Sequence, residues 1–409
     1  MRKIAIVGAG QAGLQLALGL QQKGYAVTVV SSRTPQQIRA GRVSSSQFMF
    51  DSSLQIERDL GINFWEKECP TTEGIGFSIP GPDGGRALFW EAKLDHYGQS
   101  IDQRVKFAGW LEEFAKRGGQ IIYKEASAQD LEEYARSHDL VIVAAGKGEI
   151  NQLFTRDTAR STFDQPMRAL ALTYVKKMVP RKAFTAVAFS LIPGLGEYFV
   201  FPALTVSGPC EIMVFEGVPG GPMDCWQDVK TPQQHLQRSK EILAKFLPWE
   251  AERCQEIELT DDNGILAGRF APTIRKPVCK LPSGKTILGM GDVVVLNDPI
   301  TGQGANTACK CAKVYMDCIL ERGGKPFDAG WMQQTFETFY SYAQWVAKWT
   351  NSLLTPPPPQ VLQLMGAASQ IPKLASLISN GFNNPPAYNP WWFDAAEAEK
   401  LIKRLQADN

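Results

Sequence analysis

The chain has 409 residues, of which 44% are apolar and 21% charged, and its formal net charge is +1. At about 100–200 residues per domain the length predicts two or three domains, and the balanced charge argues against nucleic-acid binding, which usually needs a basic surplus. No apolar run reaches the roughly 18 residues of a membrane-spanning helix, so we expect no membrane segment.

The first predicted elements form a dinucleotide-binding unit. An apolar strand at residues 3–7 is followed by a glycine-rich turn, an apolar helix and a second strand at 26–30. Gly8 permits a tight turn, Gly10 lets the backbone approach a pyrophosphate, and Gly13 allows the helix to pack closely on the strand. The residues predicted to bind the cofactor here are Gly8, Gly10, Gln11, Ala12 and Gly13.

One expected piece of this unit is missing. The second strand usually ends in Asp or Glu, which accepts a hydrogen bond from a ribose hydroxyl. Here the strand is followed by Ser31, Ser32 and Arg33. Losing a charge-assisted bond should weaken adenosine binding by roughly 1.5–3 kcal/mol. Arg33 could face a 2′-phosphate instead, which would favour NADP, or it could be a solvated cation at the strand end.

The next buried strand, from Leu140 to Ala145, ends at Gly146. The helical pattern at 128–136 before it supplies a crossover, so we expect the strand to join the N-terminal sheet and to bring Gly146 to the cofactor. Residues 165–275 then alternate apolar and polar side chains. This pattern predicts antiparallel strands with one solvent-exposed face, and 231–246 is predicted to be helical.

A second glycine-bearing region lies between 285 and 306. A predicted strand runs into Gly291-Asp292, where the carboxylate could accept hydrogen bonds from a ribityl chain. Gly302 and Gly304 free the backbone to approach a flat ring, and the helix that follows points its N–H dipoles at that ring. Beyond it, the aromatic residues at 330–354 have helical spacing, which favours core packing.

Cysteine and histidine content limits the chemistry. The eight cysteines lack C-x-x-C pairing, and none of the three histidines has metal-ligand spacing. We therefore predict reduced thiols, a cytoplasmic protein and no metal site. The chain also lacks the G-x-S-x-G motif of serine hydrolases, so a cofactor would have to carry any catalysis.

Taken together, these motifs resemble the FAD-binding motifs of flavoprotein aromatic hydroxylases, and more closely the two-component styrene/indole monooxygenase family. The similarity covers nearly the whole chain. Its most specific part is Asp298-Pro299-x-x-Gly302-Gln303-Gly304-Ala305-Asn306, and the other stretches that carry it are 8–14, Gly41-Arg42, 102–104, 139–147 with Gly146, Gly291-Asp292, 194–197 and 348–351.

The resemblance implies an α/β fold: a Rossmann-like FAD-binding domain with an inserted β-sheet substrate domain and C-terminal helices. The implied domains are an FAD-binding domain (1–70, 100–165 and 276–330), a substrate domain (71–99 and 166–275) and a C-terminal helical region (331–409).

The resemblance also implies an activity. A separate NADH-dependent flavin reductase would supply reduced FAD, and reaction with O2 would give a flavin C4a-(hydro)peroxide. This species would epoxidise a C=C bond conjugated to an aromatic ring. A shuttled flavin fits the missing ribose carboxylate, since oxidised FAD must leave. The expected partners are the reductase and a small aromatic substrate, with a homodimer possible and no nucleic acid or membrane.

Several site residues follow from the resemblance. Arg42 and the 302–306 turn would contact the flavin, and Pro299 would pack near its ring. Ser45, Gln47, Met49 and Ile75 match the pattern of indole-type members rather than styrene-type members. Gln47 could also accept the indole N–H, which styrene lacks. Alternatively, residues 44–47 form a polar turn with Met49 as core filler.

Two other functional classes stay open. A self-sufficient hydroxylase would consume NAD(P)H without a reductase. A non-catalytic FAD-fold binding protein would give no oxygenated product.

Overall fold

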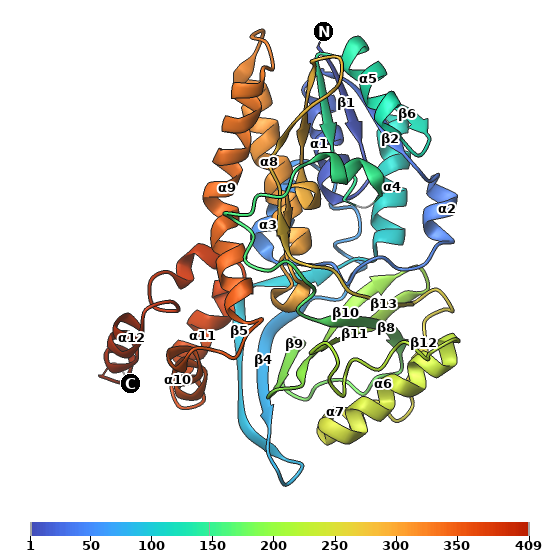
Figure 1. Ribbon diagram of the computed structural model, residues 1–409. Helices are drawn as coiled ribbons and strands as arrows, with labels where there is room; N and C mark the ends of the chain where they lie inside the picture. The colour runs from blue at the N-terminus through green and yellow to red at the C-terminus, as the bar shows by residue number, and fades with distance from the viewer. Residues whose placement is uncertain (1, 147, 408–409) are drawn as a thin grey trace.

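The computed structural model describes residues 2–146 and 148–407. The predicted domain limits at residues 1 and 409 lie outside these ranges. The described chain is built on two large sheets, one at the top of Figure 1 and one below it, with the C-terminal helices beside the lower sheet. No described helix is long and apolar enough to cross a membrane.

The upper sheet has six strands in the described ranges, in the order β15-β16-β7-β1-β2-β6. Its strands are β1 (Lys3–Val7), β2 (Ala26–Ser31), β6 (Gln120–Tyr123), β7 (Leu140–Val143), β15 (Val278–Lys280) and β16 (Thr286–Gly289). All neighbours are parallel except β15 and β16. This is the predicted Rossmann-type sheet, and it confirms that the 140–143 strand joins it.

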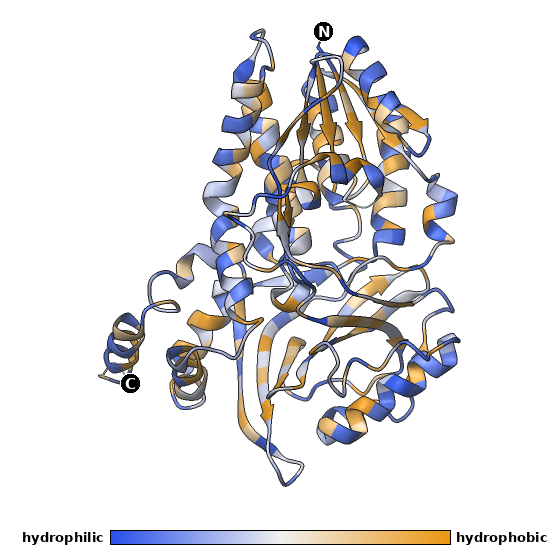
Figure 2. Cartoon of the chain, viewed as in Figure 1, coloured by the Kyte–Doolittle hydropathy of each residue, from blue (hydrophilic) through white to orange (hydrophobic). Residues whose placement is uncertain are grey.

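Helices cover this sheet, which is why its strands are almost continuously apolar (Figure 2). Those that share its core are α1 (Gln11–Gln22), α4 (Gln103–Lys116), α5 (Ala128–Ser137), α8 (Gly304–Arg322) and α9 (Ala329–Ser352). Short elements complete this part: α2 (Pro35–Arg39), α3 (Asp51–Asp59), η1 (Glu149–Leu153), η2 (Gly291–Val293), η3 (Pro299–Thr301), β14 (Thr273–Ile274) and β17 (Val295–Leu296).

The lower sheet is mostly antiparallel and has nine strands in the described ranges, in the order β12-β8-β11-β10-β9-β4-β5-β3, with β13 also paired to β8. The strands are β3 (Phe48–Met49), β4 (Thr72–Pro80), β5 (Arg86–Ser100), β8 (Ala169–Lys176), β9 (Ala186–Ile192), β10 (Gly196–Thr205), β11 (Gly208–Gly217), β12 (Glu258–Leu259) and β13 (Ile265–Gly268). Most of these strands fall within 71–99 and 166–275, the ranges predicted for the substrate domain, and that division of the chain stays a prediction.

The expectation of one solvent-exposed face on this sheet was wrong. Every residue of β10 is buried. Tyr198 and Val200 pack under α6 (Pro232–Phe246) and α7 (Pro248–Arg253), whereas Phe199 and Phe201 belong to the core on the other face. Glu197 on β10 and Glu216 on β11 are also buried, and they face other polar groups rather than water.

The second face of the lower sheet meets the C-terminal region. Helices α10 (Pro359–Ala368), α11 (Pro372–Gly381) and α12 (Ala395–Ala407), with η4 (Pro385–Tyr388), share a core with β4, β9 and β10. Figure 1 shows α10 and α11 beside the long strands β4 and β5. The last part of the chain therefore covers the second face of the lower sheet.

Candidate functional site

The first glycine turn is shaped by close backbone packing. Gly8 has a φ of +120°, and a Cβ added to it would come within 2.6 Å of the backbone of Ala144 and Ala145. A Cβ on Gly13 would lie 2.1 Å from the carbonyl oxygen of Gly8. These two glycines therefore let β1, α1 and β7 meet. A Cβ on Gly10, in contrast, would meet no described atom within 4 Å, so space remains above this position.

The start of α1 presents unpaired backbone N–H groups to that space. Gly10 is its N-cap residue and, within the described ranges, no side chain caps this end. The side chain of Gln11 points away, since its Nε2 donates to Glu57 at 2.9 Å and to Gln15 at 3.0 Å. Ala12 is buried. Gln11 and Ala12 can therefore offer only their backbone to a ligand.

The second glycine-bearing turn lies beside the first. A Cβ on Gly291 would lie 3.1 Å from the Cβ of Ala12, and one on Gly146 would lie 2.8 Å from the Cβ of Asp292. Asp292 is exposed at this edge. Segments from residues 8–13, 146 and 291–292 thus converge at the carboxyl ends of β1, β7 and β16, where ligands bind in open α/β sheets.

The third turn leads into α8. The Asp298 carboxylate accepts from the backbone N–H of Ile300 at 3.1 Å, and Gly302 takes a left-handed conformation with a φ of +64°. A Cβ on Gly304 would meet no described atom within 4 Å, and no side chain caps α8 within the described ranges. This helix start is again open to a ligand, and neighbouring Ala305 is only half-buried.

Two predicted cofactor residues of this turn use their side chains within the protein. Gln303 donates to the carbonyl oxygen of Phe382 at 2.9 Å. Asn306 accepts from the N–H of Phe50 and donates to the carbonyl oxygen of Phe48, both at 2.9 Å. They hold the turn against the C-terminal helices and β3, so their contribution to a cofactor would come through the backbone.

These features fit FAD. Two helix N-termini without side-chain caps can bind anionic groups through backbone N–H donors, and Gly10 and Gly304 leave room for close approach. The residues that would hold it are those of the three turns, and the Asp292 carboxylate would accept hydrogen bonds from the ribityl chain. Arg33 and Arg42 are both exposed, and Arg42 lies within electrostatic reach of His235 on α6. Ser31, where a ribose-binding acid was expected, bonds the carbonyl oxygen of Arg33.

The predicted substrate residues separate into three places. Ser45 and Gln47 lie with Tyr174, whose hydroxyl donates to the Ser45 carbonyl oxygen at 2.8 Å and accepts from Gln47 Nε2 at 3.1 Å. Met49 packs with Leu54 and Cys309 below the flavin turns. Ile75 instead lines an apolar cavity over the lower sheet. The structure therefore does not bring all four side chains to one surface.

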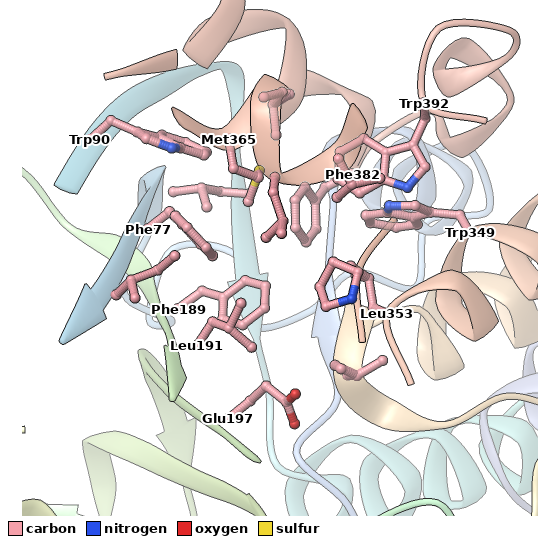
Figure 3. A pocket seen from close by; sticks show the side chains of 17 residues that line it. Phe77, Trp90, Phe189, Leu191, Glu197, Trp349, Leu353, Met365, Phe382 and Trp392 are labelled. Atoms are coloured by element: carbon pink, nitrogen blue, oxygen red, sulfur yellow. The ribbon is translucent and has the colours of Figure 1, made fainter. Parts of the chain in front are cut away.

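The cavity lies between the lower sheet and the C-terminal helices (Figure 3). The free space that it encloses is about 30 Å³, roughly the room of two water molecules. Apolar side chains from β4, β9, η3, α9 and the segment after α11 form much of its wall, among them Ile75, Phe77, Phe189, Ile300, Trp349 and Phe382. Ile300 directly follows Pro299, so the cavity reaches the turn that precedes the flavin helix.

A group of buried acids lies under this turn. Arg168 forms two hydrogen bonds with Glu197, at 2.7 and 2.8 Å. The oxygens of Glu216 meet no N–H or O–H donor in the described ranges, and the carboxyl group within hydrogen-bonding reach is that of Asp298. Burial raises the pKa of Asp298 to about 6 and that of Glu216 well above its ordinary range. One shared proton between Glu216 and Asp298 accounts for this arrangement.

Sequence reasoning missed several residues of the site. Lys106 donates to both oxygens of Glu57, at 2.8 and 3.0 Å, and Glu57 in turn accepts from Gln11. This buried network fixes the start of α1 against α3 and α4. Tyr174 and Glu197 were also missed, and the C-terminal helices were predicted as elements but not as part of the cavity wall. Trp349 was read as core packing, yet it lines the cavity. Isolated Glu or Lys residues in amphipathic segments gave no signal of burial.

Comparison with known proteins decides the family. Residues 146–253 match the family described as "Styrene monooxygenase A putative substrate binding domain". The chain is 30% identical over 393 residues to styrene monooxygenase StyA from Pseudomonas sp and to that from Pseudomonas fluorescens, covering 94% of this chain and 93% of each relative. The chain belongs to the styrene monooxygenase family. As a member, it is a flavin-dependent monooxygenase with FAD as its cofactor.

Other matches concern the fold alone. Residues 3–47, which hold β1, α1 and β2, match the family described as "NADP oxidoreductase coenzyme F420-dependent", a similarity confined to the dinucleotide-binding start. Flavin-dependent brominase Bmp2 superposes with a TM-score of 0.70 at 13% identity, over 99% of both chains. A flavoprotein/dehydrogenase from Cytophaga hutchinsonii gives 0.68 at 13%, also over 99% of both. The α/β fold predicted for this styrene monooxygenase family member is confirmed.

Proposed function

We propose that this protein is the oxygenase component of a two-component FAD-dependent monooxygenase. It takes reduced FAD from a separate NADH-dependent flavin reductase and epoxidises a C=C bond conjugated to an aromatic ring. Indole is the preferred substrate, leading towards indoxyl and indigo, and styrene is also accepted. The observation that carries this proposal is the apolar cavity, which reaches the Pro299–Thr301 turn directly before the open start of α8.

Bound reduced FAD supplies the activation of O2, with one oxygen atom passing to the substrate and the other leaving as water. The protein supplies binding and shielding. Backbone N–H groups of α1 and α8 hold the anionic parts of the cofactor. Pro299 positions the ring beside the cavity, and the aromatic wall around Phe189 and Trp349 keeps water away from the reacting atoms.

Two observations support the release of FAD and the choice of indole as substrate. Ser31 in place of a ribose-binding acid weakens retention of FAD, which suits a cofactor that is delivered and released. Ile75 in the cavity wall, where styrene-type members carry Tyr, supports indole as the substrate, and Ser45, Gln47 and Met49 follow the same pattern. A possible homodimer and a cytoplasmic location remain predictions, the latter resting on eight free cysteines.

The test is to supply chemically reduced FAD and air to the purified chain, with indole or styrene and with catalase to remove free peroxide. We expect indigo from indole and styrene oxide from styrene, with indole oxidised faster. A parallel reaction contains NADH or NADPH and oxidised FAD without a reductase. Consumption of the nicotinamide in that reaction would point to a self-sufficient hydroxylase, and absence of any oxygenated product would contradict the proposal.

A further inference from the structure

Glu216 on β11 carries a carboxyl group that is buried without an ordinary partner. The residue is 0% exposed, and neither of its oxygens meets an N–H or O–H donor in the described ranges. Buried Glu197, in contrast, is paired with Arg168 at 2.7 Å. An unpaired carboxylate in the protein interior carries a large desolvation cost, so Glu216 has to hold or share a proton.

The group that faces Glu216 is the carboxyl of Asp298, which lies within hydrogen-bonding reach and is itself 1% exposed. Two carboxyl groups so close cannot both be ionised. Burial raises the pKa of Asp298 to about 6 and that of Glu216 well above its ordinary range. At neutral pH the proton therefore sits on Glu216, whose O–H donates to the carboxylate of Asp298.

The neighbouring charges leave this proton in place. On the strands beside β11, Glu216 is opposite Glu197 on β10 and Leu170 on β8. The charged groups that act most strongly on Glu216 are Asp298, Glu197 and Arg168. Since Arg168 bonds both oxygens of Glu197, at 2.7 and 2.8 Å, its charge is mostly balanced there. Glu216 thus has two anions and one already paired cation around it.

The carboxylate of Asp298 also holds the turn that precedes α8. It accepts from the backbone N–H of Ile300 at 3.1 Å, and Gly302 closes the turn by donating to the carbonyl oxygen of Pro299 at 2.7 Å. Asp298 therefore links Glu216 on the lower sheet to the start of α8, which has no side-chain cap in the described part of the chain.

We propose that Glu216 is a positioning residue, whose protonated carboxyl donates to Asp298 and so holds the Pro299–Thr301 turn in the conformation that receives FAD. Loss of the Glu216 proton to solvent leaves two adjacent carboxylates, which repel each other and loosen the turn. FAD should then bind more weakly as pH rises. The inference rests on the proposed placement of FAD at this turn, but not on which substrate is oxidised.

The test measures the affinity for oxidised FAD by fluorescence titration of the full-length chain between about pH 6 and about pH 9. For the unmodified protein we expect the affinity to fall by roughly tenfold or more as pH rises, because binding is linked to one proton. Glu216→Gln keeps an N–H donor for Asp298 at every pH. It should therefore bind FAD within about threefold of the unmodified protein at the acid end and keep that affinity throughout.

Glu216→Leu removes the donor and should weaken FAD binding by about tenfold at every pH. The matched control is Glu211→Gln, near the start of the same strand. Burial raises the pKa of Glu211 to about 7, so this group titrates in the same range, but it lies opposite Pro202 and away from the turn. Its variant should show the pH profile of the unmodified protein.

A merely structural role for Glu216 predicts equal losses in the Gln and Leu variants, and either that result or a flat profile in the unmodified protein would overturn the inference. If neither Glu216 variant folds, infrared spectroscopy of the Glu211→Gln chain without FAD decides. The C=O band of a protonated carboxyl group should be present at neutral pH and vanish with the midpoint at which FAD affinity is lost. A spectrum without this band at neutral pH would overturn the inference.

These outcomes separate the two proposals, because FAD binding is measured without turnover. If reduced FAD supports no oxidation while FAD affinity depends on Glu216 and pH as expected, the proposed function fails and the positioning role stands. If indole or styrene is oxidised while FAD affinity is the same in all variants and at every pH, the positioning role fails and the function stands.

Discussion

The flavin turns and the substrate cavity are built in different ways. The turns consist of backbone from three short motifs, in which glycines such as Gly8 and Gly13 pack without side chains. The cavity consists of side chains from β4, β5, β9, β10, η3 and the helices from α9 onward, between residues 75 and 392. A site made of backbone can therefore be recognised in a sequence, whereas a site made by converging side chains becomes visible only in the fold.

The largest effect is expected for Trp349→Ala. This side chain is buried between Phe382, Tyr388 and Trp392 and lines the cavity. Removing it should lower the free energy of unfolding by about 3–5 kcal/mol, as for other buried aromatic residues. If the two regions are independent, FAD affinity should stay within about threefold, measured by fluorescence titration. Trp349→Phe serves as the milder variant, and a parallel loss of FAD affinity in both would show that the regions are coupled.

Gly13→Ala should act on the flavin turns instead. The new Cβ would collide with the carbonyl oxygen of Gly8, so we expect a loss of roughly 1–3 kcal/mol in stability and a loss of measurable FAD binding. Gly304→Ala is the control, because its Cβ has space in the protein alone. That variant should unfold like the unmodified protein in urea yet bind FAD more weakly. Equal stability of the two variants would contradict the packing argument.

The acids under the Pro299 turn predict a pH dependence. The pKa of Asp298 is raised to about 6 by burial, and the pKa of Glu216 is raised further. Between the ordinary pKa near 4 and these values, the folded state binds more protons than the unfolded state, so stability falls as pH rises. Glu216→Gln should flatten this fall from the ordinary pKa upward through about pH 6, the raised pKa of Asp298, measured by urea unfolding.

The control for this experiment is Glu258→Gln, an exposed glutamate paired with Lys177 on the same sheet. Its profile should follow that of the unmodified protein. An unchanged slope in Glu216→Gln would mean that the acids under the turn do not share a proton.

The smallest effect is expected for Gln47→Val. Because Tyr174 already bonds its amide, the variant should move the ratio of indole to styrene oxidation towards styrene by less than about fivefold. Ser44→Ala, which removes a hydroxyl that bonds Gln103 rather than Gln47, is the control. An unchanged ratio in Gln47→Val would contradict a role of Gln47 in recognising the N–H group.

Much of the fold followed from local patterns. The strand at residues 3–7, the Gly8–Gly13 turn and the 140–143 strand are short contiguous segments with one structural solution, and all were predicted. The covered face of the lower sheet was missed because the polar residues on it, such as Thr173, bond buried partners like Ser239 on α6 rather than water. An alternation of polar and apolar residues cannot distinguish a face covered by polar partners from a face exposed to water.

The candidate site, like the fold, could be predicted from the sequence only in part. Ile75 was predicted from the family pattern, but its neighbours Trp349 and Phe382 are about 300 residues away in sequence, in helices whose aromatic spacing also suits an ordinary core. The pairing of Arg168 with Glu197 depends on the register of β10 and the path of the chain before β8. No local motif carries that information.

The bonds from Arg168 to the carbonyl groups of Leu353 and Leu354 have a consequence for how the protein is made. During synthesis the nucleotide-binding half can fold while the last fifty or so residues are still inside or near the ribosome. The apolar cavity over the lower sheet therefore lacks the wall that the C-terminal helices form until translation ends. A newly emerging chain would thus form its first glycine turn early, but the Gln303 turn, which Phe382 holds, and the cavity would be completed only after release.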